Sequence, residues 1–159
     1  MTDSRATTLF ETNGKKTIAF PGSKGPRTST WGQTKKMAFE LNKTGIDVTF
    51  LTETDGLICA DSLLKIRNTY RLADFKYCVT KNSNTLAKEL EHGFMQASLV
   101  VLKLRNMDAG VFKDAIGYIL RNEIPYGNLI LMNKYGKLVE LEKRDIKTGI
   151  FRKKIRGLL

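Results

Sequence analysis

The run from Ser98 to Leu104 constrains the fold of this chain more than any other segment. Its sequence, Ser-Leu-Val-Val-Leu-Lys-Leu, is apolar at nearly every position, which is typical of a strand buried on both faces of a sheet. The segment before it has apolar residues at helical spacing, namely Leu86, Leu90 and Phe94. Asp108 stands as a candidate N-cap before a second helical segment. A central strand between two amphipathic helices predicts a layered fold of helices and strands.

Shorter segments complete the predicted fold. Alternating apolar residues indicate strands, and Ser, Thr, Asn or Asp before a periodic segment indicates the start of a helix. We expect a helix from Ser29 or Thr30 to Thr44, strands at Ile46–Leu51, Gly56–Ala60, Leu63–Ile66 and Arg71–Val79, a helix capped by Asn82 or Ser83, and a hairpin of Asn128–Asn133 with Lys137–Leu141. The predicted class is α+β, with an N-terminal helix, a central, mostly antiparallel β-sheet with helices packed on one face, and a basic C-terminal extension.

Composition divides the chain into three parts. Residues 1–29 are rich in Gly, Ser, Thr and Lys and predict a flexible leader with one short strand at 17–20. Residues 30–141 contain the predicted helices and strands. Residues 142–159 carry seven basic and two acidic side chains. This tail predicts either a basic helix that binds nucleic acid, with Lys153 and Lys154 as contacts, or a solvated tail whose apolar residues dock on the domain.

The charge of the chain indicates a polyanionic partner. Lys and Arg total 27 against 16 acidic residues, so the net charge is +11 at pH 7 and the pI is about 9.7. An excess of this kind is typical of nucleic-acid binding, because each neutralised phosphate releases counterions. The alternative is a basic surface without such a partner. No apolar run approaches the roughly 20 residues that span a bilayer, and the N-terminus does not have the pattern of a signal peptide. We therefore expect a cytoplasmic protein without a membrane partner.

Cysteine and histidine offer little chemistry here. The two cysteines, Cys59 and Cys78, stand in predicted strands and are interpreted as small buried residues in a reducing compartment. His92 is the sole histidine, so a Cys/His metal cluster is excluded. A catalytic role for His92, on the polar side of its predicted helix, stays open, and the other candidates are carboxylates, lysines, hydroxyls and amides.

Such groups gather between residues 60 and 96. Asp61 is followed by Asp74-Phe75-Lys76, in which the acid and the lysine share one face of a predicted strand. One hypothesis is that Asp61 and Asp74 bind a divalent cation while Lys76 stabilises charge on a phosphate, as in nucleases resembling the restriction-endonuclease superfamily with their P-D…(D/E)-x-K pattern. Ala60 stands where that pattern has proline.

A second hypothesis needs no metal. An RNA 2′-hydroxyl attacks the neighbouring phosphate, with Asp61 or Asp74 as the general base and Lys76 as an electrostatic stabiliser. The further candidates are Arg71 as a second stabiliser, Thr80 and Thr85 as catalytic hydroxyls, and Asn82, Asn84 and Gln96 as substrate ligands. The structural alternative is that Asn82, Ser83 and Thr85 cap a helix and that Lys76 protects a strand edge.

The order of these motifs resembles a known group of nucleases. The segments that carry the resemblance are Leu41–Val48, Phe50–Glu53, Ala60-Asp61, Ala73–Lys76, Thr80, Asn84-Thr85, Gln96–Leu102 and Asn128–Glu140. Together they are similar to the C-terminal tRNase domain of contact-dependent growth-inhibition toxins and to the related barnase/EndoU/colicin/RelE-like (BECR) nucleases. The resemblance implies a nuclease-like domain over residues 30–141, with Asp61, Asp74, Lys76, Thr80, Asn84, Thr85 and Gln96 in its active site.

The resemblance also implies an activity and partners. We expect a toxin-like endoribonuclease that cleaves RNA by metal-independent transesterification and without a cofactor. The first candidate substrate is tRNA. A cognate immunity protein is the expected protein partner, and the cytoplasm of a target cell is the expected place of action. The alternatives are a magnesium-dependent DNA nuclease and a non-catalytic nucleic-acid-binding protein of a mobile element.

Overall fold

The computed structural model describes residues 6–20, 29–52 and 60–159, and it arranges their strands in a single eight-stranded sheet. The strands are β1 (Thr7–Thr12), β2 (Lys15–Ala19), β3 (Asp47–Phe50), β4 (Ser62–Ile66), β5 (Thr69–Cys78), β6 (Leu99–Leu104), β7 (Asn128–Asn133) and β8 (Leu138–Leu141). The helices are α1 (Trp31–Lys43), α2 (Ser83–Gln96), α3 (Ala109–Arg121), α4 (Lys143–Thr148) and α5 (Phe151–Lys154). Within these ranges, no helix combines the length and apolar character that crossing a bilayer requires.

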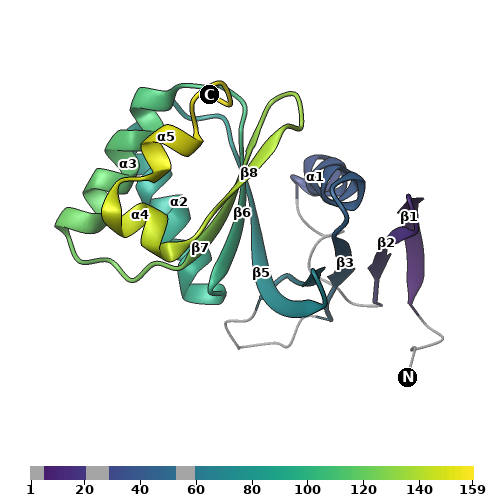
Figure 1. Ribbon diagram of the computed structural model, residues 1–159. Helices are drawn as coiled ribbons and strands as arrows, with labels where there is room; N and C mark the ends of the chain where they lie inside the picture. Colours follow the sequence, from purple (N-terminus) through teal and green to yellow (C-terminus); the bar gives the residue numbers. More distant parts are fainter. Residues whose placement is uncertain (1–5, 21–28, 53–59) are drawn as a thin grey trace.

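The strands lie side by side in the order of the sequence (Figure 1). Four of the seven pairings are antiparallel, namely β1–β2, β3–β4, β4–β5 and β7–β8, while β2–β3, β5–β6 and β6–β7 are parallel. The predicted α+β class with a mostly antiparallel sheet is confirmed. Most strands and helices lie within a few residues of their predicted bounds. The expected strand at Gly56–Ala60, apart from Ala60, lies outside the described residues, as does Cys59.

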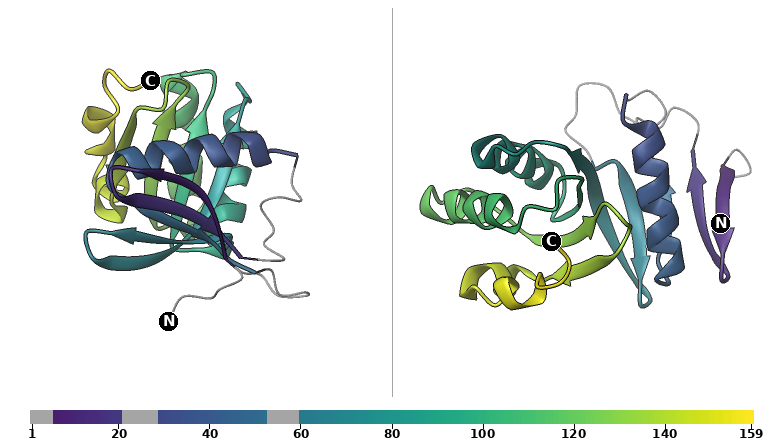
Figure 2. Two further views of the ribbon diagram at one scale, coloured as in Figure 1. Left: turned by 90° about the vertical axis from the view of Figure 1, so that its right-hand side faces the viewer. Right: turned by 90° about the horizontal axis from the view of Figure 1, so that it is seen from above.

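Helices cover both faces of the sheet, which corrects the expectation of a single helical face. Helices α2, α3, α4 and α5 lie on one face, and α1 lies on the other (Figures 1 and 2). The reason is visible in β6, where every residue is buried. Val100, Leu102 and Leu104 join the core under α2 and α3, whereas Leu99 and Val101 join the core under α1. A strand that is apolar on both faces needs a layer on each.

Residues 7–19, which the sequence assigned to a flexible leader, belong to the sheet. Strands β1 and β2 form a hairpin, and β2 pairs in parallel with β3 through Thr17 opposite Val48. The short strand expected at residues 17–20 thus corresponds to β2. The buried Thr17 hydroxyl donates to Asn42 Oδ1 at 2.7 Å, and Asn42 Nδ2 donates to the Ile46 carbonyl oxygen at 2.8 Å. These bonds tie the hairpin to the end of α1.

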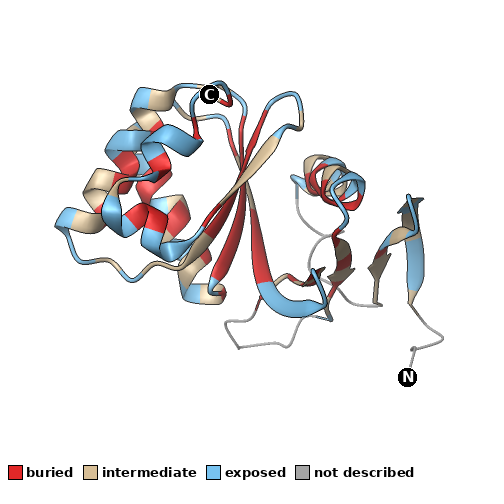
Figure 3. Ribbon diagram, viewed as in Figure 1, coloured by how far each residue is buried: buried red, intermediate tan, exposed pale blue. Residues whose placement is uncertain are grey.

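The basic C-terminal segment is docked on the domain. Ile146, Phe151 and Ile155 are buried in the core that α2 and α3 share with the sheet, while the basic residues of the segment are exposed. Both buried and exposed stretches are seen along the ribbon of α4 and α5 (Figure 3). A capping box starts α4, in which the Glu142 side chain and the Asp145 side chain each accept from the other residue's backbone N–H. Two predictions were made for this tail, and the structure agrees with the one in which its apolar residues dock on the domain.

Candidate active site

The sheet places Asp61 and Asp74 opposite each other. Ser62 of β4 pairs with Ala73 of β5, so the antiparallel register brings positions 61 and 74 together one step further. Asp61 Oδ2 accepts a hydrogen bond from the Phe75 backbone N–H at 3.3 Å, which fixes the Asp61 side chain against β5. Because side chains alternate along a strand, Asp74 and Lys76 share the face that α2 covers, whereas Ala73 and Phe75 lie in the core under α1.

Helix α2 passes close over Asp74, whose side chain is 1% exposed. Gly93 makes this approach possible. A Cβ added at Gly93 would lie 2.8 Å from Val100 Cγ2 and 3.3 Å from Asp74 Oδ2. A side chain here would push the helix away from β5 and β6 or displace the carboxylate. Sequence reasoning missed Gly93, although a glycine inside a helical pattern costs about 1 kcal/mol relative to alanine and so signals a packing role.

The environment keeps a proton on Asp74 at neutral pH. Burial is the main cause, and a hydrogen bond to the Asp61 carboxyl group together with the Asp61 charge adds to it, so the pKa of Asp74 is raised to about 8. The Lys76 ammonium opposes this shift, with its Nζ 3.3 Å from Asp74 Oδ2. The Lys76 side chain is 19% exposed and therefore connects the carboxylate pair to the solvent side.

The donor set suits a hard divalent cation. Two adjacent carboxyl groups that hold a proton between them can exchange it for a cation, since Mg²⁺ is commonly bound by one or two carboxylates together with phosphate oxygens and water. The described residues contain no group of three or more His, Cys, Asp or Glu that could hold a metal ion by themselves. A cation held by Asp61 and Asp74 would thus take its remaining ligands from substrate phosphate and water.

The predicted hydroxyl and amide ligands lie at the other end of α2. Asn82 caps the helix by accepting from the Thr85 N–H at 3.0 Å, and Thr80 Oγ1 accepts from the Asn82 N–H at 3.0 Å. The Thr80 carbonyl oxygen accepts from Asn106 Nδ2. The eight-residue step from Thr85 to Gly93 corresponds to about 12 Å along the helix. Thr80, Asn82, Asn84 and Thr85 are therefore not brought to the carboxylate pair, and the capping alternative describes Asn82.

Gln96 and Arg71 are placed differently from these ligands. Gln96 is the last residue of α2 and follows Gly93 by about one turn, so it lies at the carboxylate end of the helix. Arg71 is exposed and opposite Leu64 in the sheet. By strand alternation it shares the face of Ala73, away from Asp74.

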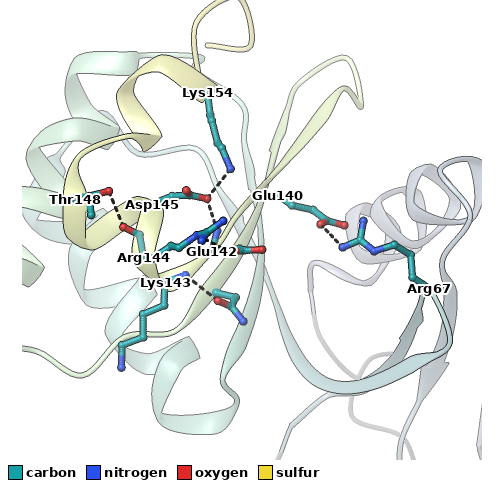
Figure 4. A network of polar contacts seen from close by, with 9 residues as sticks. Arg67, Glu140, Glu142, Lys143, Arg144, Asp145, Thr148 and Lys154 are labelled. Carbon is teal, nitrogen blue, oxygen red and sulfur yellow. Dashed lines mark hydrogen bonds and ion pairs between the residues drawn. The ribbon is translucent and has the colours of Figure 1, made fainter.

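The two predicted lysine ligands of the C-terminal segment lie far from the pair. Helix α5 contacts β8, and three strand spacings, about 14 Å in total, separate β8 from β5. Lys153 is exposed there. Lys154 Nζ lies 2.7 Å from Asp145 Oδ2 and holds α5 against α4 (Figure 4). Lys154 is thus part of a structural contact, and the residues that the structure brings together are Asp61, Asp74 and Lys76, with Gln96 nearby.

Comparisons with known proteins give one fold relationship. No protein-family model and no curated protein sequence matches the chain. The fold is similar to one chain of a solved structure described as a CdiA-CT/CdiI toxin and immunity complex from Burkholderia pseudomallei, with a TM-score of 0.54 and 22% identity. The match covers 77% of this chain and 91% of the other. This likeness shows a shared fold. The resemblance to toxin domains is thus met at the level of the fold alone, and the finer assignment to the BECR group gains no support.

Proposed function

We propose that this protein is the nuclease domain of a contact-dependent growth-inhibition toxin and that Asp61, Asp74 and Lys76 form its cleavage site. The observation that carries the proposal is the opposed pair of carboxyl groups with an ammonium 3.3 Å from one of them. Asp61 directly precedes β4, and Asp74 and Lys76 lie on the adjacent strand β5. Two carboxyl groups and an ammonium at one place can carry out phosphodiester cleavage. The net charge of +11 supports a polyanionic substrate.

The placement of the side chains favours metal-assisted cleavage over the metal-independent reaction. The metal-independent hypothesis named Thr80 and Thr85 as candidate catalytic hydroxyls, and these residues lie at the other end of α2 from the carboxylate pair. The carboxylate pair fits a divalent cation instead, with Asp61 and Asp74 as its protein ligands. When bound, such a cation supplies Lewis-acid activation and neutralises charge at the phosphate.

The roles of the protein groups follow from their positions. Asp61 and Asp74 act as anions, so Asp74 must first lose its proton. In this reaction a water oxygen bonds to the phosphorus and gives its proton to the solvent, while the phosphorus–oxygen bond to the leaving group breaks. Lys76 lies at the solvent side of the pair and donates a hydrogen bond to the leaving oxygen as it gains charge. Gln96, at the same end of α2, can hydrogen-bond the nucleic acid beside the scissile bond.

Two further parts of the proposal concern the substrate and the partner. RNA remains the expected substrate, and tRNA is the first candidate, because the sequence resembles tRNA-cleaving toxin domains. A cognate immunity protein is the expected protein partner, and the fold relationship to a chain of a toxin and immunity complex supports it.

The test is cleavage of total RNA and of plasmid DNA, each with Mg²⁺ and with EDTA, by the wild type, Asp74→Asn and the exposed control Asp114→Asn. We expect the wild type and the control to degrade RNA with Mg²⁺, EDTA to stop the reaction, and Asp74→Asn to be inactive while its circular dichroism stays native. RNA cleavage that persists in EDTA would restore the metal-independent hypothesis. Nicking of plasmid alone would make DNA the substrate, and binding without cleavage of either polymer would refute the nuclease assignment.

A further inference from the structure

A second polar feature lies on the opposite face of the sheet. A cavity of about 540 Å³ opens between α1, the ends of β5 and β6, and the turn between β7 and β8. The turn and α1 lie on the same side of the sheet (Figure 1). The residues that line the cavity are Gln33, Lys36, Phe39, Glu40, Tyr77, Lys103, Arg105, Lys134, Tyr135 and Gly136. The carboxyl ends of parallel strands, here β5, β6 and β7, are a frequent location of ligand sites.

The lining is strongly cationic. Four basic side chains reach the cavity, from Lys36 on α1, Lys103 and Arg105 at the end of β6, and Lys134 in the turn. The acidic residue of the lining is Glu40, whose carboxylate lies 3.1 Å from Lys43 Nζ and is thus already paired. A concave surface with this imbalance attracts anions, because its low-dielectric walls concentrate the positive potential.

Lys103 is the most unusual member of the set. It belongs to the fully buried strand β6 and is 8% exposed. Its ammonium donates a long hydrogen bond, 3.5 Å, to Gln33 Oε1. Burial and the nearby Lys36 lower its pKa, while Glu40 acts in the opposite direction. A buried ammonium is costly unless an anion or several acceptors compensate it, so a bound anion would stabilise this part of the fold.

Aromatic side chains stand beside the charges. Tyr135, in the β7–β8 turn, is 70% exposed and next to Lys134, and Tyr77 belongs to the wall formed by β5. The turn is fixed by Asn133 Oδ1, which accepts from the Tyr135 and Lys137 backbone N–H groups at 2.9 and 3.1 Å. A held, exposed ring beside cations offers a surface on which a base can stack.

We propose that this cavity binds one unpaired nucleotide of the nucleic-acid substrate, with its phosphate on Lys103, Lys36 and Arg105 and its base against Tyr135. A volume of about 540 Å³ suits a group of that size and not a duplex. A base can reach such a pocket when it is free of pairing, as in single-stranded loops and ends. The inference rests on the proposed nuclease function and specifies its substrate as nucleic acid with a single-stranded segment.

The cavity is separate from the cleavage site. Tyr77 and Lys76 are neighbours on β5 but lie on opposite faces of the sheet, because side chains alternate. A substrate that uses both sites must pass around the end of the sheet. The cavity residues therefore act in binding and positioning, and their loss is expected to raise KM with little effect on kcat.

Binding can be measured without cleavage in the Asp74→Asn background. The probe is a fluorescein-labelled single-stranded RNA of mixed sequence, compared with a blunt duplex of the same length. We expect Lys103→Met and Lys36→Met to raise the Kd for the single strand about tenfold each and Tyr135→Ala about fivefold. The exposed control Lys113→Met, on α3, should leave the Kd within about twofold. Replacing either cavity lysine should also reduce the slope of log Kd against log salt concentration by about one.

The binding measurements on these variants can refute nucleotide binding in the cavity. Lys36 is exposed, so Lys36→Met keeps the test valid if Lys103→Met fails to fold. Unchanged single-strand binding in Lys36→Met and Tyr135→Ala would overturn the proposal, as would equal loss for the duplex and the single strand. Loss of immunity-protein binding with RNA binding intact would assign the cavity to that partner and also refute the inference. Because no arm requires cleavage, failure of the nuclease assignment would be seen separately.

Discussion

Asp74 shows how burial and one neighbour can alter the chemistry of a single carboxyl group. It is almost fully enclosed between β5 and α2, it shares a hydrogen bond with Asp61, and its pKa is raised from 3.8 to about 8. In the unfolded chain the same group loses its proton near pH 4. Between these two values the folded state binds more protons than the unfolded state, so stability falls as the pH rises.

The Asp74→Asn variant tests whether ionisation of Asp74 lowers the stability of the fold as the pH rises. Well below pH 4 both proteins should have similar free energies of unfolding, since the carboxyl group is then protonated in both states, and at pH 4 the difference should still be small. Above pH 8 the variant should be more stable by about 1 kcal/mol or more, because one pKa unit corresponds to about 1.4 kcal/mol. Urea denaturation at pH 4, 7 and 9 measures the difference, with Asp114→Asn as the exposed control. A variant that is less stable at pH 9 than at pH 4, relative to the wild type, would contradict the raised pKa.

The sequence predicted part of the candidate site for a clear reason. An acid and a lysine two residues apart on a strand must share a face, so the pairing of Asp74 with Lys76 follows from alternation alone. The position of Thr85 depended on which end of α2 meets the sheet next to Asp74, and nothing local specifies that. Lys103 was not selected as a candidate, because a lysine in an apolar run does not reveal on which face of the sheet it lies or which side chains surround it.

Helix α2 illustrates how an element positions a site through a residue without a side chain. Gly93→Ala would place a Cβ 2.8 Å from Val100 Cγ2 and 3.3 Å from Asp74 Oδ2. We expect a loss of stability of about 1–3 kcal/mol from overpacking, together with reduced cleavage as the carboxylate moves. Gly32→Ala is the matched control in α1, since a Cβ there meets nothing within 4 Å. It should gain about 0.4–1 kcal/mol. Thermal unfolding of both variants measures these changes in stability. A Gly93→Ala protein that gains stability like the control would refute the close approach of α2 to Val100 and Asp74.

The C-terminal helices depend on one buried carboxylate. Asp145 is 3% exposed and accepts from Lys154 Nζ at 2.7 Å and from the Glu142 N–H at 2.9 Å. The hydrogen bond from Lys154 is the main cause of its lowered pKa. A lowered pKa contributes stability that is present above the unfolded pKa of about 3.8 and is lost as the pH falls below it.

We therefore expect Asp145→Asn to lose about 1–3 kcal/mol at pH 7, since both partners lose a charged acceptor. The difference from the wild type should shrink toward pH 2. Denaturation curves at the two pH values test this, with the exposed Lys147→Met as a control. An equal loss at both pH values would mean that packing, and not the charge of Asp145, holds the segment.

At the scale of the whole molecule, two layers of helices enclose a sheet that is apolar on both faces. The elements could be predicted from the sequence, because caps such as Asn82 and Asp108 and the periodicity of each segment are local signals. Their arrangement could not. The α1 layer, the pairing of the N-terminal hairpin with β3 and the docking of α4 and α5 depend on contacts between distant residues, such as Thr17 with Asn42.

The same architecture separates two polar sites. The carboxylate pair and Lys76 lie under α2, and the cationic cavity lies beside α1, so the sheet separates the proposed cleavage site from the proposed binding site. If both proposals hold, a polyanion approaches each face, and the net charge of +11 favours that approach.

The most direct test of the central claim is the single-turnover rate of RNA cleavage by Lys76→Met, compared with Thr85→Ala and the exposed control Lys88→Met. If Asp61, Asp74 and Lys76 form the cleavage site, Lys76→Met should lose about a hundredfold or more, while Thr85→Ala and Lys88→Met stay within about threefold of the wild type. A Lys76→Met protein that cleaves at the wild-type rate, or a Thr85→Ala protein that is inactive although folded, would contradict the account.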